Sequence, residues 1–167
     1  MRWNMVGLTR RARGLRRMLI ATVVAASAVV VVPMAVAQPP VITPAPAFDF
    51  VDSSTCAFPV SVHFVKNKET QKEFSSGKVL ITGALSVEFS ANGKTVALNI
   101  SGPIQVTLNG GSVTIAGRGV GAGPVRLPDG SVTLGYTAGP TSIDPATGVA
   151  TLQHGSFKLD VCAALAV

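Results

Sequence analysis

Aromatic side chains, charges and cysteines are all scarce in this sequence. Of its 167 residues, 5% are aromatic and 13% are charged, and there are two cysteines. The single Trp is Trp3, so one Tyr and the Phe residues supply every aromatic ring beyond residue 37. A sugar-binding site that relies on aromatic stacking is therefore poorly supplied.

Acidic residues are missing from the first 37 positions, which carry six arginines. All eight Asp and Glu residues follow residue 37, together with the other eight of the 14 Lys and Arg residues. The formal net charge of +6 thus belongs to the N-terminal segment, and the rest of the chain is neutral. Because nucleic-acid-binding domains need clustered basic residues on the folded surface, no nucleic-acid partner is expected.

The sequence also lacks an apolar run long enough to span a bilayer. The longest, Met18–Val32, has 15 residues, whereas a spanning helix needs about 20, which disfavours a membrane anchor. It follows an arginine-rich stretch and precedes small residues at Ala35 and Ala37, a pattern typical of a secretory signal peptide. We predict that residues 1–37 are a signal peptide, that the protein is secreted by a bacterium, and that the mature chain has no transmembrane segment.

Beyond residue 37 the chain divides into a proline-rich segment and a β domain. Residues 38–47 contain four prolines, which favour extended conformations and predict a spacer. From 48 to 167 apolar and polar residues alternate with a period of two, which is typical of strands. The polar stretch 67–76 fits either an edge strand or an exposed loop, and only residues 163–167 fit a helix.

Turns between the predicted strands indicate which residues pair. Asn92–Gly93, Gly110–Gly111 and Asp129–Gly130 suit tight two-residue turns, 144–148 suits a longer loop, and Gly102–Pro103 predicts a bend within a strand. The predicted partners are Phe89 with Val96, Val87 with Leu98, Leu85 with Ile100, Leu108 with Val113, Val106 with Ile115, Leu127 with Val132, Val125 with Leu134, and Ile143 with Val149.

The two cysteines, Cys56 and Cys162, are predicted to form a disulfide, since exported chains with two cysteines usually bridge them. Bridged Cα atoms lie within about 7 Å, so the first and last strands must be neighbours or face each other across a core. An all-β, antiparallel up-and-down meander of about eight strands whose ends meet predicts a closed barrel, with a β-sandwich as the alternative. A metal site at the cysteines is disfavoured, because no CxxC motif or Cys/His cluster is present.

Motifs for catalysis are missing as well, including the Gly-x-Ser-x-Gly elbow. His63 alternates onto the face opposite the apolar stripe, and a β-bulge at Gly155 accounts for the changed alternation beside His154. The segment Gly117–Ala122 nominally matches a dinucleotide fingerprint, but no helix is predicted after it, so we interpret it as a flexible loop. We expect no catalytic residue, no cofactor and no metal, and the ligand-binding residues stay unassigned. A catalytic histidine would lie in an enclosed pocket beside one of four carboxylates: Asp49, Asp52, Asp144 or Asp160.

Three short motifs are similar to those of a group of exported proteins. They are Cys56-Ala57-Phe58-Pro59-Val60, Leu98-Asn99-Ile100-Ser101-Gly102-Pro103 and Asp160-Val161-Cys162-Ala163. Over about residues 48–167, the chain resembles small secreted β-rich proteins of actinobacteria that have no assigned function. The resemblance implies export and paired cysteines, and it carries over no catalytic residue.

Two functions fit these observations. The first is an exported, non-catalytic β domain that acts as a binding or cell-envelope module with an unknown partner. The second is a barrel that binds a small apolar ligand, with or without converting it. The interior distinguishes the two, because large inward residues fill a barrel, whereas Gly83, Gly102, Gly117 and Ala150 would leave room.

The signal-peptide prediction fixes the mature N-terminus at Gln38. Intact-mass spectrometry of protein recovered from the medium of an expressing bacterium should give the mass of residues 38–167. Retention of residues 1–37 on the recovered protein would contradict it.

Overall fold

The structure is a computed structural model that describes residues 38–167, so the predicted signal peptide lies outside the described residues. The described residues form two sheets and one short helix, α1 (Val161–Leu165). The four-stranded sheet has the order β2 (Phe50–Asp52), β3 (Val60–Asn67), β6 (Leu85–Ala91) and β7 (Lys94–Asn99). The ten-stranded sheet has the order β1 (Val41–Pro44), β4 (Thr70–Glu73), β5 (Lys78–Thr82), β8 (Ile104–Asn109), β9 (Ser112–Gly117), β12 (Thr141–Ile143), β13 (Ala150–Leu152), β10 (Val120–Arg126), β11 (Val132–Ala138) and β14 (Ser156–Asp160).

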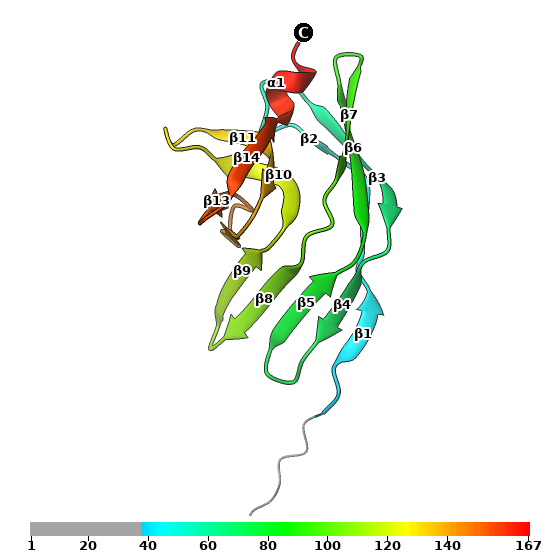
Figure 1. Cartoon of the computed structure of the whole chain (residues 1–167), viewed down its shortest axis with the longest axis vertical. Helices are drawn as coiled ribbons and strands as arrows, with labels where there is room; N and C mark the ends of the chain where they lie inside the picture. Colours follow the sequence, from blue (N-terminus) through cyan, green and yellow to red (C-terminus); the bar gives the residue numbers. More distant parts are fainter. Residues whose placement is uncertain (1–37) are drawn as a thin grey trace, which may run out of the picture. The chain divides into compact units, whose positions relative to one another are not determined.

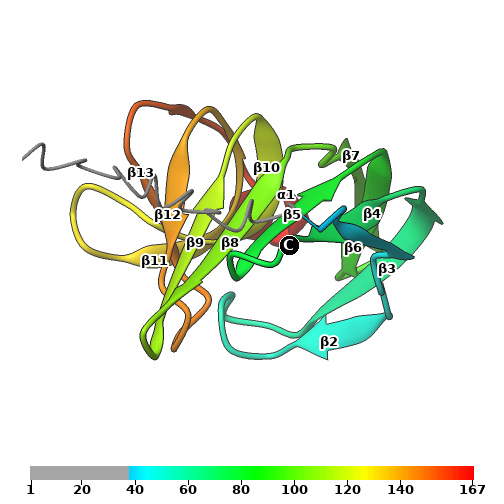
Figure 2. The same ribbon diagram turned by 90° about the horizontal axis from the view of Figure 1, so that it is seen from below.

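Four connections lead from one sheet into the other, and the first of them joins β1 to β2. The other three are the sheet corners. β3 leads into β4, β5 into β6 and β7 into β8, with one strand of each pair in each sheet (Figures 1 and 2). The predicted bend at Gly102–Pro103 is the third of these corners. A Cβ atom at Gly102 would lie 2.3 Å from the carbonyl oxygen of Val120, so glycine is required for this close approach. Strands that change sheets at a bend are typical of sandwich corners.

The main hydrophobic core lies between the four-stranded sheet, β11 and α1. The carboxylate of Asp160 caps α1 by accepting a hydrogen bond from the backbone N–H of Ala163 (2.9 Å). The helical pattern at 163–167 is correct for its first three residues, because α1 begins two residues earlier, ends at Leu165 and packs against one side of the core. No helix among residues 38–167 is long and apolar enough to cross a membrane. The buried core residues are Val60, Val62, Val87, Phe89, Leu134, Val161 and Leu165.

The predicted disulfide is confirmed, and it joins the two sides of this core. The Cα atoms of Cys56 and Cys162 lie 5.5 Å apart, and both residues pack against the core. Cys56 precedes β3 of the four-stranded sheet, whereas Cys162 lies in α1, directly after β14 of the ten-stranded sheet. The bridge thus links the segment between β2 and β3 to α1, whereas β1 and β2 precede it in the chain.

Two predicted hairpins have the predicted register. β6 and β7 turn at Asn92–Gly93 with φ values of 53° and 75°, and β8 and β9 turn at Gly110–Gly111. The third predicted pair of the first hairpin lies just beyond the ladder, where the N–H of Ile100 donates to the carbonyl oxygen of Leu85 (2.9 Å). The observed partners are Phe89 with Val96, Val87 with Leu98, Leu108 with Val113, and Val106 with Ile115.

The register predicted for the β10–β11 hairpin is wrong by one residue. Val125 lies opposite Thr133, because the loop has three residues rather than two. A two-residue turn would place Pro128 in the closing pair, where an N–H donor is needed that proline lacks. The loop closes instead through the N–H of Leu127, which donates to the carbonyl oxygen of Ser131 (2.8 Å).

The register predicted for β12 and β13 is also wrong by one residue. Ile143 lies opposite Ala150, because the N–H of Asp144 donates to the carbonyl oxygen of Val149 (3.0 Å) and makes these two the closing pair. The carboxylate of Asp144 accepts a hydrogen bond from the N–H of Ala146 (2.9 Å), which supports this tighter loop.

The prediction of a closed barrel is wrong, because neither sheet closes on itself. The strand order also departs from a simple meander, since β12 and β13 lie between β9 and β10, and β13 pairs with β10 in parallel. The arrangement of two sheets is instead sandwich-like, which was the alternative. The disulfide joins Cys56 to Cys162 between two sheets, so the bridge does not require a continuous ring of strands.

The proline-rich segment 38–47, predicted as a spacer, contributes β1 to the ten-stranded sheet. β1 is an edge strand that pairs with β4, and Pro44 is tolerated as its last residue because one side of an edge strand makes no ladder hydrogen bonds. The polar stretch 67–76 contains β4, which lies inside the sheet between β1 and β5. The stretch therefore contains a strand, as one of the two alternatives predicted, but this strand is not at the edge, because β1 pairs with its outer side.

Loss of the disulfide should lower the free energy of unfolding by about 2–5 kcal/mol, as for native bridges in small exported domains. We expect this loss for Cys56→Ser, measured by urea unfolding of the oxidised protein. The double variant Cys56→Ser/Cys162→Ser is the control, because a reductant should destabilise the wild type and leave this variant unchanged. Equal stability of oxidised wild type and double variant would contradict the prediction.

Candidate functional site

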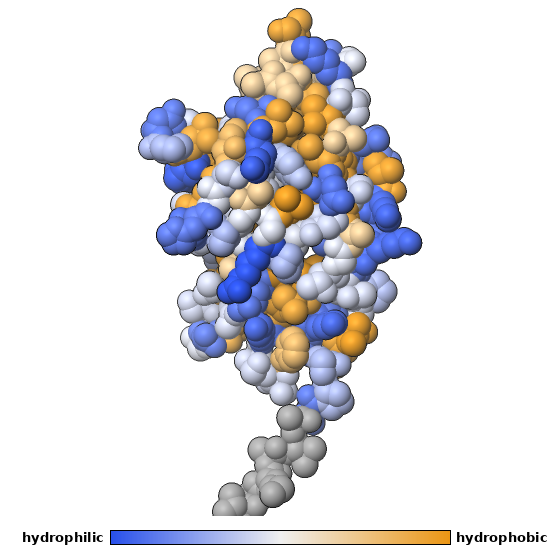
Figure 3. Space-filling model, viewed as in Figure 1, coloured by the Kyte–Doolittle hydropathy of each residue, from blue (hydrophilic) through white to orange (hydrophobic). Residues whose placement is uncertain are grey.

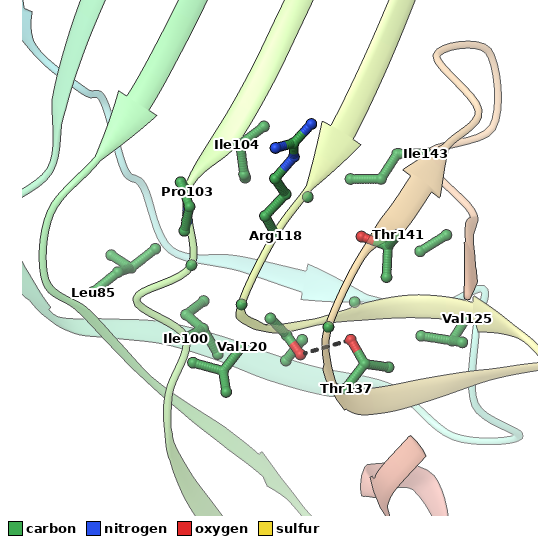
Figure 4. A pocket seen from close by; sticks show the side chains of 18 of the residues that line it. Leu85, Ile100, Pro103, Ile104, Arg118, Val120, Val125, Thr137, Thr141 and Ile143 are labelled. Atoms are coloured by element: carbon green, nitrogen blue, oxygen red, sulfur yellow. Dashed lines mark hydrogen bonds between the residues drawn. The ribbon is translucent and has the colours of Figure 1, made fainter. Parts of the chain in front are cut away.

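Two adjoining hollows lie within the described residues. The first has a volume of about 230 Å³ and lies at the β7–β8 corner and at the connection from β9 to β10. Figure 4 shows Leu85, Ile100 and Ile104 on one side of this hollow and Thr141 and Ile143 on the other. Its walls are therefore mostly aliphatic.

The second hollow has a volume of about 410 Å³ and lies between the four-stranded sheet and the β10–β11 hairpin. Phe50, Phe64 and Phe89 line it, so it is an extension of the apolar core. The two hollows have five lining residues in common, and apolar cavities of about 300–1,000 Å³ are typical of small-molecule sites. The common residues are Ile100, Ala122, Gly123, Pro124 and Gly148.

β10 leaves space at the first hollow because it carries glycine where a side chain would fill it. A Cβ atom at Gly121 or at Gly123 would have no atom within 4 Å, and both residues line the hollow. Neither glycine has a positive φ, so the backbone conformation does not require glycine at these positions. The space is thus set by side-chain size.

The glycines that were predicted to leave room act differently. A Cβ atom at Gly83 or at Gly102 would lie 2.3 Å from a backbone oxygen, and at Gly117 it would lie 2.5 Å from the Thr141 hydroxyl oxygen. These glycines allow close approach of neighbouring segments rather than opening a cavity. Of the four predicted residues, Gly102, Gly117 and Ala150 line the first hollow.

The first hollow also has a small number of polar groups. The hydroxyl of Thr137 donates to the carbonyl oxygen of Gly121 (3.4 Å, dashed in Figure 4). Glu69 is 9% exposed, and burial raises the pKa of its carboxyl. Arg118 is exposed, and in Figure 4 its side chain extends away from Val120 and Thr137. The lining polar side chains are Glu69, Arg118, Thr137 and Thr141.

The face seen in Figure 3 has no large continuous apolar patch that would indicate a second kind of functional site. Hydrophobic residues there are dispersed among hydrophilic ones. Large continuous apolar patches mark interaction surfaces, whereas scattered apolar residues are ordinary. This face therefore shows no interaction surface of that kind, and the hollows are the candidate site.

His63 lies within hydrogen-bond distance of one of the expected carboxylates. Its Nδ1 lies 2.5 Å from Oδ2 of Asp49, and Asp49 Oδ1 accepts a hydrogen bond from the N–H of Phe64 (2.9 Å). That backbone hydrogen bond first, and then the one from His63, hold the pKa of the Asp49 carboxyl below its ordinary value. The side chains are 59% and 56% exposed and line neither hollow, so the pair joins residue 49 to β3 in open solvent.

The other three expected carboxylates lie at the end of β2, in a turn and at a helix cap, and of these Asp52 lines the second hollow. Asp52 accepts hydrogen bonds from the N–H groups of Ser54 (2.8 Å) and Thr55 (3.1 Å), while Asp144 and Asp160 act as described above. His154 is exposed and lines neither hollow. Among residues 38–167, no group of three or more His, Cys, Asp or Glu side chains is placed to hold a metal ion.

Two local interpretations of the sequence need correction. The bulge lies where Tyr136 pairs with Leu159 and Thr137 with Phe157, rather than at Gly155, because β13 and β14 pair with different strands. The glycine-rich segment 117–122 is mostly strand, since β9 ends at 117 and β10 begins at 120. It lines the first hollow as the connection between two strands of the ten-stranded sheet.

No protein-family model, curated protein or solved structure matches this chain.

Sequence reasoning did not identify Glu69, Gly121 or Gly123 as site residues. The available signal was the alternation of the two glycines within one strand, since glycine is disfavoured inside strands unless space or close approach requires it. No sequence signal marks Glu69, because it lies in a polar stretch and becomes buried only when the corners meet.

The lowered pKa of Asp49 predicts a pH-dependent contribution to stability. Because the pKa is lower in the folded than in the unfolded state, the ionised carboxylate stabilises the fold above the unfolded pKa, and this is lost as pH falls through the folded pKa. Asp49→Asn should therefore be less stable than wild type at pH 7, and the two proteins should converge in acid. Chemical unfolding across pH measures this, and a difference that is constant with pH would contradict it. His63→Gln should have a smaller effect, because the hydrogen bond from Phe64 is kept.

Proposed function

We propose that the protein is an exported, non-catalytic module that binds a small apolar ligand in the two adjoining hollows of its β domain. The observation that carries this proposal is the unfilled apolar space beside β10, where Gly121 and Gly123 have no atoms near a built Cβ. Concave, mostly apolar cavities with a few polar groups are the usual form of small-molecule sites.

The size of the space supports a ligand rather than an ordinary packing defect. Apolar cavities of about 150 Å³ stay dry and take up molecules as small as benzene. The hollows here have volumes of about 230 and 410 Å³ and share part of their lining. Atoms that line such space lack contact partners on one side, so an apolar molecule gains dispersion contacts on entering.

Binding without chemistry is favoured over turnover. General acid–base catalysis needs a titratable group held beside the substrate in a site that limits water. His63 and its partner Asp49 are exposed and line neither hollow. Glu69 and Asp52 do line the hollows, but neither forms a hydrogen bond to a histidine among the described residues. The disulfide and the predicted signal peptide support export, since disulfides persist in oxidising compartments.

Filling the space at β10 should abolish ligand binding without unfolding the protein. Gly123 lines both hollows and has open space around its Cβ position, so Gly123→Val adds a residue that suits a strand. With the neutral dye N-phenyl-1-naphthylamine as probe, we expect saturable fluorescence enhancement in the wild type and at least about tenfold weaker binding in the variant, equivalent to about 1.4 kcal/mol.

Thr114→Val is the matched control, because it adds the same residue to β9 at an exposed position outside both hollows. Its dye affinity should equal that of the wild type. Circular dichroism and thermal unfolding check that both variants fold. No saturable dye binding by the wild type, or equal binding by Gly123→Val, would contradict the proposed function.

A further inference from the structure

Glu69 is held at the β3–β4 corner by its backbone. Its carbonyl oxygen accepts a hydrogen bond from the N–H of Ala45 (3.0 Å), and its own N–H donates to Oδ1 of Asn67 (2.9 Å). Asn67 in turn donates through Nδ2 to the carbonyl oxygen of Ala45 (2.8 Å). This closed set of hydrogen bonds fixes the backbone, so the position of Glu69 at the wall of the first hollow is built into the corner.

The side chain of Glu69 has no partner within the described residues. Only 9% of the residue is exposed, and the one close contact between a basic and an acidic side chain within residues 38–167 joins His63 and Asp49. Desolvation alone accounts for the raised pKa of its carboxyl, with no hydrogen bond or charge acting against it. Its carboxylate oxygens keep some contact with solvent, since no side-chain oxygen among residues 38–167 is both fully buried and without a hydrogen-bond partner. Partial burial of a charged group is still costly, and Glu69 belongs to the mostly apolar lining of the first hollow.

We propose that Glu69 is the polar anchor of the ligand site, and that the site takes an apolar molecule carrying one cationic nitrogen. The ammonium group binds the Glu69 carboxylate, and the apolar part lies against Leu85, Ile100 and Ile104 in the same hollow. A positive charge beside the carboxyl favours its ionised form and replaces the hydration lost on burial. This inference rests on the proposed function, because it names the ligand class of the same site.

Arg118 is the one group in the lining that would favour an anionic ligand instead. It is exposed, and Figure 4 shows its side chain extending away from Val120, so its charge is solvated. Pairs with an exposed charge contribute about 0–1 kcal/mol, whereas a partner for a buried charge contributes more. The buried Glu69 therefore outweighs the exposed Arg118 in selecting the sign of the ligand.

The test compares n-octylamine, n-octanol and n-octanoate, which share one alkyl chain and differ in the charge of the head group. Each competes at pH 7 with N-phenyl-1-naphthylamine for protein expressed from the full-length sequence. We expect the amine to bind the wild type at least about tenfold more tightly than the alcohol. In Glu69→Gln this preference should disappear, while the affinity for the alcohol stays unchanged.

Glu73→Gln is the matched control, because it makes the same change at an exposed position of β4 outside both hollows, and it should keep the preference for the amine. The wild-type comparison of amine and alcohol needs no variant and stands even if Glu69→Gln fails to fold. Equal affinity for amine and alcohol in the wild type, or an amine preference that survives in folded Glu69→Gln, overturns the role of Glu69. Tightest binding of n-octanoate, lost in Arg118→Gln, also overturns it. Failure of the dye and all three probes to bind rejects the proposed function itself.

Discussion

The sheet corners are the constraint on which the rest of the structure depends. The corners β3–β4, β5–β6 and β7–β8 carry the chain from one sheet into the other, and at two of them glycine lets backbones approach more closely than a Cβ atom would allow. At Gly83 a built Cβ atom lies 2.5 Å from the Cα atom of Glu69, so this contact also brings Glu69 to the corner. The first hollow lies where the corners meet. Substitution of Gly83 or Gly102 would therefore change both the packing of the two sheets and the shape of the first hollow.

The disulfide and the hollow are related through the packing of a small core. Space beside β10 means that atoms around Gly121 and Gly123 forgo dispersion contacts, which lowers stability. The cross-link between Cys56 and Cys162 restricts the unfolded chain instead, and this contribution does not need a filled interior. A domain stabilised in this way tolerates an open apolar cavity, as a ligand-binding module requires.

The residues that were predicted well are those governed by local rules. Asn92–Gly93 and Gly110–Gly111 adopt the positive φ values that two-residue turns need, so the register of two hairpins follows from sequence. The register at β10–β11 was predicted wrongly from the turn preference of Asp129–Gly130. That turn would need an N–H donor at residue 128, which is proline, so a three-residue loop forms instead. The candidate site was missed almost entirely. Glu69 and Gly123 are 54 positions apart, and nothing in either local sequence indicates that they line one cavity.

The amino-acid sequence by itself determined the strand-rich character of residues 48–167, the cysteine pair and the two hairpins, because alternation, cysteine number and turn chemistry act over a few neighbouring residues. Only the tertiary structure decided between a closed ring and two sheets, since a cross-link between Cys56 and Cys162 fits both. It also decided which glycines leave space and which permit contact, because that depends on what lies opposite each missing Cβ atom. The burial of Glu69 is another such case, since the residue becomes only 9% exposed when distant segments close around it.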